Sequence, residues 1–219
     1  VQNCRLFKPN YFIYVNNAGA SDWKIINNKV NNSNNDAVGF YAGGANTIIQ
    51  DNEITYYDSN NQYAIRFNTG DADNVVITGN EIMGDTYGPL VIQGTSGDYI
   101  DNAIVYDNYF YAAETDSYYG TVLSYVNNSN VSGNIFENLG TTYTLHCSRL
   151  KNSDVYDNTF INNTQGIRLY YSDDNRIYRN RVTEARTRGI TVTSSSTGNL
   201  IYDNYFENID QRNTYLNTF

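Results

Sequence analysis

The chain has 219 residues, among them 35 asparagines, 22 tyrosines, 16 glycines and only two prolines, and its 23 acidic against 14 basic residues give a formal net charge of -9. This composition excludes collagen and coiled coils, and the acidic balance argues against nucleic acid as a partner, because phosphate binding needs clustered lysine and arginine. No apolar run approaches the roughly 20 residues that cross a bilayer, so we expect no membrane span.

The first predicted elements begin at residue 1. The first repeat begins with an aliphatic residue, Val1, a position that is polar in later repeats, Cys4, and an apolar residue, Leu6. A short segment with alternating apolar residues, Ile13 and Val15, follows. Such alternation predicts a strand with one buried face. The chain opens on valine rather than methionine and shows no signal peptide, so we expect residues 1–219 to be a single domain excised or processed from a larger precursor.

The same pattern recurs eight times with asparagine at the polar position. Each asparagine follows an isoleucine or valine by three residues and precedes a valine, isoleucine or phenylalanine by two. The asparagines are Asn28, Asn52, Asn80, Asn108, Asn134, Asn158, Asn180 and Asn204. After the last of them, Tyr215 and Leu216 stand at the spacing of the alternating segment. Regular self-similarity at about 25 residues indicates a repeat architecture.

A corner is expected immediately before each asparagine. That position holds residue types that tolerate a left-handed backbone or a tight bend. They are Asn27, Asp51, Gly79, Asp107, Gly133, Asp157, Arg179 and Asp203. The alternating segments, such as residues 65–67, 167–169 and 190–192, follow at less constant distances. We therefore expect loop insertions to gather along one edge of the molecule.

A unit of this size with short strands cannot bury its own apolar face, so it must stack on its neighbours. Parallel stacking places equivalent positions about 4.8 Å apart. The asparagines would then form a ladder in which each amide donates to the next coil's carbonyl. The predicted fold is all-β: a single-stranded right-handed parallel β-helix (solenoid) of about nine coils.

The motifs at residues 201–206 (Ile-Tyr-Asp-Asn-Tyr-Phe), 155–160 (Val-Tyr-Asp-Asn-Thr-Phe) and 166–169 (Gly-Ile-Arg-Leu) carry a family resemblance. The chain resembles the right-handed parallel β-helix repeats of the pectin-lyase-like superfamily, and within it the asparagine-rich repeats of NosD-like periplasmic proteins. The resemblance covers essentially the whole chain. It implies a fold rather than an activity, because the motif residues are core and corner positions.

Several families that this chain resembles are polysaccharide lyases, hydrolases or epimerases, but their histidine motifs are absent from it, and we assign no catalytic residue. An ungapped alignment of coils from residue 145 onward places His146 beside Arg168 and Ser148 beside Tyr170. In a lyase for acidic glycans, Arg168 would neutralise the sugar carboxylate, His146 would be the base and Tyr170 the acid. The competing interpretation is that these residues are ordinary surface side chains. We leave the question of enzymatic activity open and favour a protein without it.

No metal and no cofactor are expected. Glu53 and Glu81 share one column with Asp51 nearby, but this cluster guarantees fewer oxygens than a hard cation needs. Lys29, one coil below, is expected to pair with Glu53. The NosD-like resemblance implies copper, which binds clusters of histidine, methionine or cysteine. The chain has one histidine, one methionine and two cysteines.

Outward tyrosines form the predicted interaction surface. Tyr156, Tyr178 and Tyr202 occupy one column in consecutive coils, and Tyr205 stands one residue after an asparagine. Tyrosine combines apolar area with a hydroxyl. Three interpretations stay open for these residues: plain sheet surface, contact with another subunit, or binding of sugar rings.

The two cysteines are too far apart along the stack to pair within one chain. Cys147 falls in an inward column and is expected to be buried, whereas Cys4 could form a disulfide between subunits. Glycosylation sequons occur at Asn31, Asn127, Asn130 and Asn162.

The favoured function is an extracellular structural module, secreted or at the cell surface, that self-assembles with copies of itself into a layer, sheath, filament or appendage. The alternatives are a polysaccharide lyase or epimerase acting on acidic glycans, and a carbohydrate-binding or adhesive β-helix.

Overall fold

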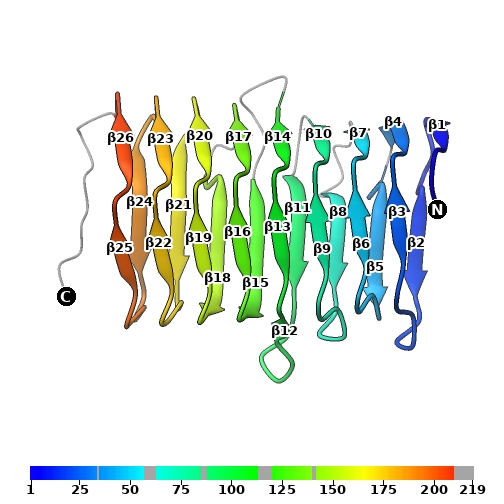
Figure 1. The fold of residues 1–219 in the computed structure, drawn as a ribbon, viewed down its shortest axis with the longest axis horizontal. Helices are drawn as coiled ribbons and strands as arrows, with labels where there is room; N and C mark the ends of the chain where they lie inside the picture. Colours follow the sequence, from blue (N-terminus) through cyan, green and yellow to red (C-terminus); the bar gives the residue numbers. More distant parts are fainter. Residues whose placement is uncertain (34, 57–62, 85–87, 113–119, 140–141, 210–219) are drawn as a thin grey trace.

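A computed structural model describes residues 1–33, 35–56, 63–84, 88–112, 120–139 and 142–209. Every regular element in these ranges is a β-strand, and the strands wind into a straight rod of stacked coils (Figure 1). The strands form three sheets, named A, B and C, and each named strand pair is parallel. The chain is therefore a right-handed parallel β-helix, as the repeat predicted.

The three sheets run the length of the rod, and their strands follow one another in stacking order. Sheet A contains β3 (Lys24–Ile26), β6 (Ile48–Gln50), β9 (Val76–Thr78), β13 (Ile104–Tyr106), β16 (Asn130–Ser132), β19 (Asp154–Tyr156), β22 (Arg176–Tyr178) and β25 (Leu200–Tyr202). Sheet B contains β1 (Arg5–Phe7), β4 (Lys29–Ser33), β7 (Glu53–Tyr56), β10 (Glu81–Gly84), β14 (Tyr109–Tyr111), β17 (Ile135–Glu137), β20 (Thr159–Ile161), β23 (Arg181–Thr183) and β26 (Tyr205–Glu207). Sheet C contains β2 (Ile13–Asn16), β5 (Val38–Ala42), β8 (Tyr63–Asn68), β11 (Gly88–Gln93), β15 (Thr121–Asn127), β18 (Leu145–Lys151), β21 (Gln165–Tyr170) and β24 (Arg188–Thr193), with β12 (Ile100–Asp101) pairing to β15.

Inward columns of apolar side chains fill the rod, a column being the set of equivalent positions in successive coils. The aromatic part is a stack in which the ring centroids of Phe110 and Phe136 lie 5.2 Å apart and those of Phe136 and Phe160 lie 4.8 Å apart. Cys147 lies in an inward column beside Leu169 and is fully buried, as predicted. Burial of these columns stabilises the fold by about 25 cal/mol per Å² of apolar surface.

The predicted asparagine ladder is present inside the corner between sheets A and B. Asn134 is representative: its Oδ1 accepts the backbone N–H of Asn108 at 3.0 Å and the Asn108 Nδ2 at 2.9 Å. Its own Nδ2 donates forward to Asn158 Oδ1 at 3.0 Å and also back to the Val105 carbonyl at 2.9 Å. Each interior asparagine therefore links three successive coils, one more than the repeat pattern predicted.

The corner before each ladder asparagine is left-handed at all eight predicted positions, with φ between 52° at Asn27 and 64° at Gly133. At Gly79 a Cβ would lie 2.4 Å from Asp51 Oδ1, so a side chain there would displace the Asp51 carboxylate. Two residues separate each sheet A strand from the sheet B strand that follows it. Because this turn has a constant length, the asparagine motif keeps the same spacing in every repeat and can be recognised in the sequence.

Loop length varies at both edges of sheet C, so the expectation of a single variable edge was wrong. On one side β17 ends at Glu137 and β18 begins at Leu145, whereas β20 ends at Ile161 and β21 begins at Gln165. On the other side β8 ends at Asn68 and β9 begins at Val76, whereas only two residues separate β15 from β16. The spacing pattern did not separate the two edges because it measured only the total length of each repeat.

A second asparagine ladder, which the repeat motif does not reveal, follows the outer corner between sheets C and A. Asn74 Nδ2 donates to Asn46 Oδ1 at 3.0 Å, and Asn102 Nδ2 donates to Asn74 Oδ1 at 3.0 Å. These side chains are exposed and have positive φ. The exterior amides donate toward the N-terminal coil, whereas interior Asn–Asn bonds are donated toward the C-terminal coil.

The N-terminal residues continue the stack as predicted. Leu6 pairs with Val30, and the Cys4 backbone N–H donates to Asn28 Oδ1 at 2.9 Å. Cys4 thus occupies the asparagine column of the first coil. Tyr215 and Leu216 lie outside the described residues.

Candidate functional site

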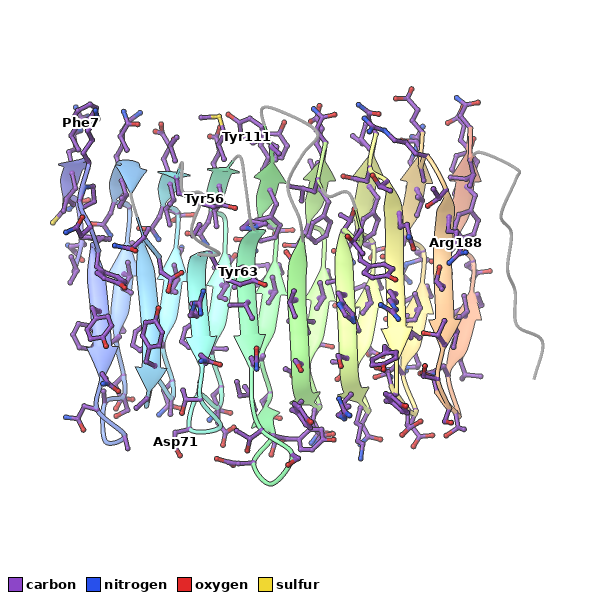
Figure 2. All side chains as sticks on the ribbon, turned by 180° about the vertical axis from the view of Figure 1, so that it is seen from behind. Phe7, Tyr56, Tyr63, Asp71, Tyr111 and Arg188 are labelled. Atoms are coloured by element: carbon purple, nitrogen blue, oxygen red, sulfur yellow. The ribbon has the colours of Figure 1, made fainter. Side chains whose placement is uncertain are left out.

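The outer face of sheet C carries the candidate lyase residues, and the structure brings them together. Figure 2 is turned by 180° from Figure 1 and looks onto sheet C, with Tyr63 of β8 and Arg188 of β24 labelled. In the register between β18 and β21, His146 lies opposite Arg168 and Ser148 lies opposite Tyr170. The adjacency inferred from the ungapped alignment is therefore confirmed.

Arg168 lies between two aromatic rings. Its guanidinium carbon is 4.2 Å from the ring centroid of Tyr143 and 4.7 Å from that of Tyr170, distances typical of cation–π contacts. Among the described residues, no carboxylate forms an ion pair with Arg168, and its buried Nε has no hydrogen-bond partner there. A half-buried cation without a described counter-charge can accept an anionic ligand.

His146 packs against the same aromatic rings, with its centroid 5.2 Å from that of Tyr143 and 6.3 Å from that of Tyr170. Burial, reinforced by the positive charge of Arg168, lowers the pKa of His146 to about 4. The imidazole is therefore neutral at pH 7 and a weak base. A catalytic base works best with a pKa near the working pH, so this geometry favours anion binding over proton abstraction.

A second charged cluster on sheet C was not predicted from the sequence. The carboxylate of Asp36 is fully buried, accepts the Tyr63 backbone N–H at 2.7 Å and the Tyr41 hydroxyl, and forms an ion pair with Arg66, whose Nε lies 2.9 Å from Oδ2. Burial raises the pKa of Asp36, although the hydrogen bonds and Arg66 oppose the shift. Because its carboxylate already has these three partners, this cluster fixes the chain entering β5 rather than offering an open ligand site.

On the outer face of sheet A the predicted tyrosine column forms a stack. The rings of Tyr156 and Tyr178 lie 5.0 Å apart and those of Tyr178 and Tyr202 lie 5.1 Å apart, each pair within 4° of parallel. Arg179 lies 4.9 Å above the Tyr178 ring and pairs with Asp157 at 2.7 Å. Tyr202 is exposed and Tyr156 and Tyr178 are half-buried, and because the rings stack face to face they present their edges to solvent.

Tyr205 lies apart from this stack. It is in β26 of sheet B, where Arg181 lies 5.4 Å from its ring centroid, and it is 54% exposed. Its motif position suggested a shared surface with the other tyrosines, but the corner between sheets A and B turns it onto a different face.

An aliphatic column, not predicted from the sequence, runs beside the tyrosine column on sheet A. Ile48, Val76 and Ile104 lie in register in β6, β9 and β13 and point outward. Their signal in the sequence is an aliphatic residue four positions before Asn52, Asn80 and Asn108. The repeat motif includes only the position three before the asparagine, which points inward.

The carboxylates near the first coils form a surface ion pair rather than a metal site. Lys29 pairs with Glu53, as predicted, and Glu53 lies in register with Glu81. An open depression of about 350 Å³ beside them is lined by both signs of charge, including Arg5 and Asp51. Within the described ranges, no group of three or more histidine, cysteine, aspartate or glutamate residues is placed to hold a metal ion.

Both cysteines are free: Cys4 is half-buried, and burial raises the pKa of the Cys147 thiol to about 12. Two of the sequon asparagines belong to exterior hydrogen-bond chains. Asn127 Nδ2 donates to Asp101 Oδ1 at 2.8 Å, and Asn162 Nδ2 donates to Asn138 Oδ1 at 2.7 Å. A glycan on either nitrogen would leave a single N–H for that bond. The sequons Asn31 and Asn130 lie in β4 and β16, and glycosylation at all four sites stays a prediction.

Comparison with known families agrees with the geometry. The family described as right handed beta helix region matches residues 11–148, and the family described as periplasmic copper-binding protein (NosD) matches residues 112–218. The chain belongs to the right-handed beta helix region family, which is matched over more than half of its length. A search of curated proteins finds no match. In the described part of the chain, no helix has the length and apolar character needed to cross a membrane.

The side chains of this chain do not fit the copper named in the NosD description. Copper sites use converging imidazole and sulfur ligands. The chain has a single histidine and a single methionine. His146 and Cys147 are adjacent but project from opposite faces of β18, and Cys147 is fully buried.

Proposed function

We propose that this chain is a structural β-helix module, one domain over residues 1–219, that acts outside the cytoplasm and packs side by side with copies of itself. The NosD description, a periplasmic protein, supports a location in the cell envelope or outside the cell. The enzymatic alternative gains little support, because the one histidine is a weak base.

The outer face of sheet A carries this proposal. Ile48, Val76 and Ile104 form a continuous outward aliphatic row over β6, β9 and β13, where Ile104 is 36% exposed and Tyr106 beside it is 37% exposed. Leu200 and Tyr202, 60% and 42% exposed, lie on β25 at the end of the sheet. Contiguous exposed apolar surface marks an interaction site, whereas isolated exposed apolar residues do not. The backbone of this face repeats at every coil, which suits contact with another rod.

Sedimentation velocity over a wide range of protein concentration tests the proposal. We expect the sedimentation coefficient to rise with concentration in the wild-type chain. The Ile104→Glu variant should stay monomeric, because a charge replaces apolar surface at the contact. The matched control is Val122→Glu, an equivalent change on the outer face of sheet C, which should associate like wild type. A wild-type chain that remains monomeric at the highest concentration would refute the proposal.

A second candidate function, binding of an acidic polysaccharide or its cleavage by a lyase or epimerase reaction, follows from the Arg168 cluster. Arg168 can donate to a uronate carboxylate while Tyr143 and Tyr170 offer apolar ring faces to a sugar. We expect weak binding of polygalacturonate or alginate, lost in Arg168→Met, and no binding of neutral glucans. Equal behaviour of wild type and Arg168→Met across acidic glycans would eliminate this candidate. Formation of unsaturated uronate, followed by ultraviolet absorbance, would show that the site is catalytic.

A further inference from the structure

From β13 to β25, the outer face of sheet A has a two-column chemistry that is complementary to itself. Each strand presents two outward residues, one at its first position and one at its third, on either side of an inward residue. The first column reads Lys24, Ile48, Val76, Ile104, Asn130, Asp154, Arg176 and Leu200. The third-position column reads Ile26, Gln50, Thr78, Tyr106, Ser132, Tyr156, Tyr178 and Tyr202.

We propose that two copies of this chain pack face to face through sheet A with their rods parallel, related by a two-fold axis that runs along the rod over the inward column. This inference rests on the proposed function and specifies its partner. Such an axis keeps every coil level with the same coil of the other copy and exchanges the two columns. Each first-column residue therefore faces the third-column residue of the same strand in the other copy.

The exchange produces chemically matched contacts along the second half of the rod. Ile104 faces Tyr106 of the second copy, and Leu200 faces Tyr202, so apolar surface meets apolar surface. Asn130 faces Ser132, a donor and acceptor pair. Because the axis is two-fold, each contact occurs twice.

The charged residues are matched in the same way. Asp154 faces the hydroxyl-bearing Tyr156 of the second copy, and Arg176 faces the hydroxyl of Tyr178, since the faces of that ring are covered by Tyr156 and Tyr202. Within one chain Asp154 and Arg176 already form an ion pair, and the Arg176 side chain is 56% exposed. The dimer would therefore cover this pair with hydroxyl groups that can hydrogen-bond to it.

An antiparallel dimer lacks this match. A two-fold axis parallel to the strands reverses the stack and sets the first column against the first column of the other copy. With full overlap, Arg176 would then face Ile48 and Asp154 would face Val76. Covering a charged pair with aliphatic groups costs more than it returns. This difference selects the parallel arrangement, in which the ion pair meets tyrosine hydroxyls instead.

The size of the face predicts a weak dimer. Eight strands spaced about 4.8 Å apart give a length of about 34 Å, and three residues per strand give a width of about 10 Å. Side chains on both copies bring the buried surface to the order of 1,000 Å², the lower limit for a specific interface. We expect dissociation constants in the micromolar range rather than an obligate dimer.

A mixing experiment tests the pairing. Ile104→Glu and Tyr106→Lys should each weaken dimerisation by about tenfold or more, since each buries a charge against an uncharged partner. Mixing the two variants should recover most of the wild-type affinity, because the mixed dimer places Glu against Lys at one contact and keeps Ile against Tyr at the other. The control mixture is Ile104→Glu with Gln50→Lys, which lies two coils away. It should recover no more affinity than Ile104→Glu mixed with wild type, because that mixed dimer already regains one of the two Ile–Tyr contacts.

Each result decides between distinct statements. Recovery only in the first mixture supports the parallel dimer. Weakening by both single variants without recovery overturns the parallel pairing but leaves packing through sheet A. Association that neither variant weakens overturns the role of sheet A while self-packing stands, and a monomeric wild type overturns the inference and the proposed function together. Unchanged circular dichroism and thermal midpoints establish that the variants are folded.

Discussion

Replacement of Asn134 by alanine measures what the interior asparagine ladder contributes to stability. The side chain accepts two bonds from Asn108 and donates to Asn158 and to the Val105 carbonyl. In Asn134→Ala the buried Asn108 N–H loses the acceptor that Asn134 Oδ1 provides, which costs about 1–3 kcal/mol, and about two further net bonds of ~1 kcal/mol each are lost. We expect the free energy of unfolding to fall by about 3–5 kcal/mol.

The exterior ladder offers a matched control. Asn74→Ala removes one accepted and one donated bond, but the exposed partners bond to water instead, so the main loss is the strain of alanine at a φ of 57°, about 1 kcal/mol. Urea unfolding followed by circular dichroism measures both variants, and amide exchange at Asn108 reports the local opening. Equal losses for Asn134→Ala and Asn74→Ala would refute the assignment of stability to the interior ladder.

Further predictions concern His146, the cysteines and the phenylalanine stack. Because the folded His146 has a pKa of about 4, the unfolded chain binds a proton between pH 6.5 and 4 that the folded chain does not, so the free energy of unfolding should decrease as pH falls through this window. Arg168→Met should raise the nuclear magnetic resonance titration midpoint of His146, and an unchanged midpoint would contradict the electrostatic part of the shift. A thiol reagent should modify Cys4 in the folded chain and Cys147 only after denaturation; rapid reaction of both would show that the inward column is open. Phe136→Ala should lower the free energy of unfolding by about 3–5 kcal/mol in the urea assay, and a loss below about 1 kcal/mol would mean that the aromatic stack collapses around the cavity.

The elements that the sequence predicts best are those joined by the two-residue turn between sheets A and B. That turn has a constant length, so sequence spacing translates directly into position along the rod. The interior ladder, the left-handed corners and the inward column of Phe110, Phe136 and Phe160 were all predictable for this reason.

Features that depend on loop paths were not predictable. The cluster of Asp36, Tyr41 and Arg66 joins β8 to the segment before β5, and no spacing rule gives the path of that segment. His146 and Arg168 were matched because the repeats from residue 145 onward align without gaps. Burial was harder: the lowered pKa of His146 arises from neighbouring rings that the pattern of one strand does not show.

The connection between sheets A and B has one length, whereas the loops at both edges of sheet C vary in length. A whole repeat is therefore an exchangeable cassette: duplication or deletion of one repeat leaves the turn geometry of every other repeat intact. Each added cassette would lengthen the molecule by about 4.8 Å. Duplication of repeats in the gene can thus change the length of the rod in fixed increments. The loops at the edges of sheet C can vary in sequence independently of that length.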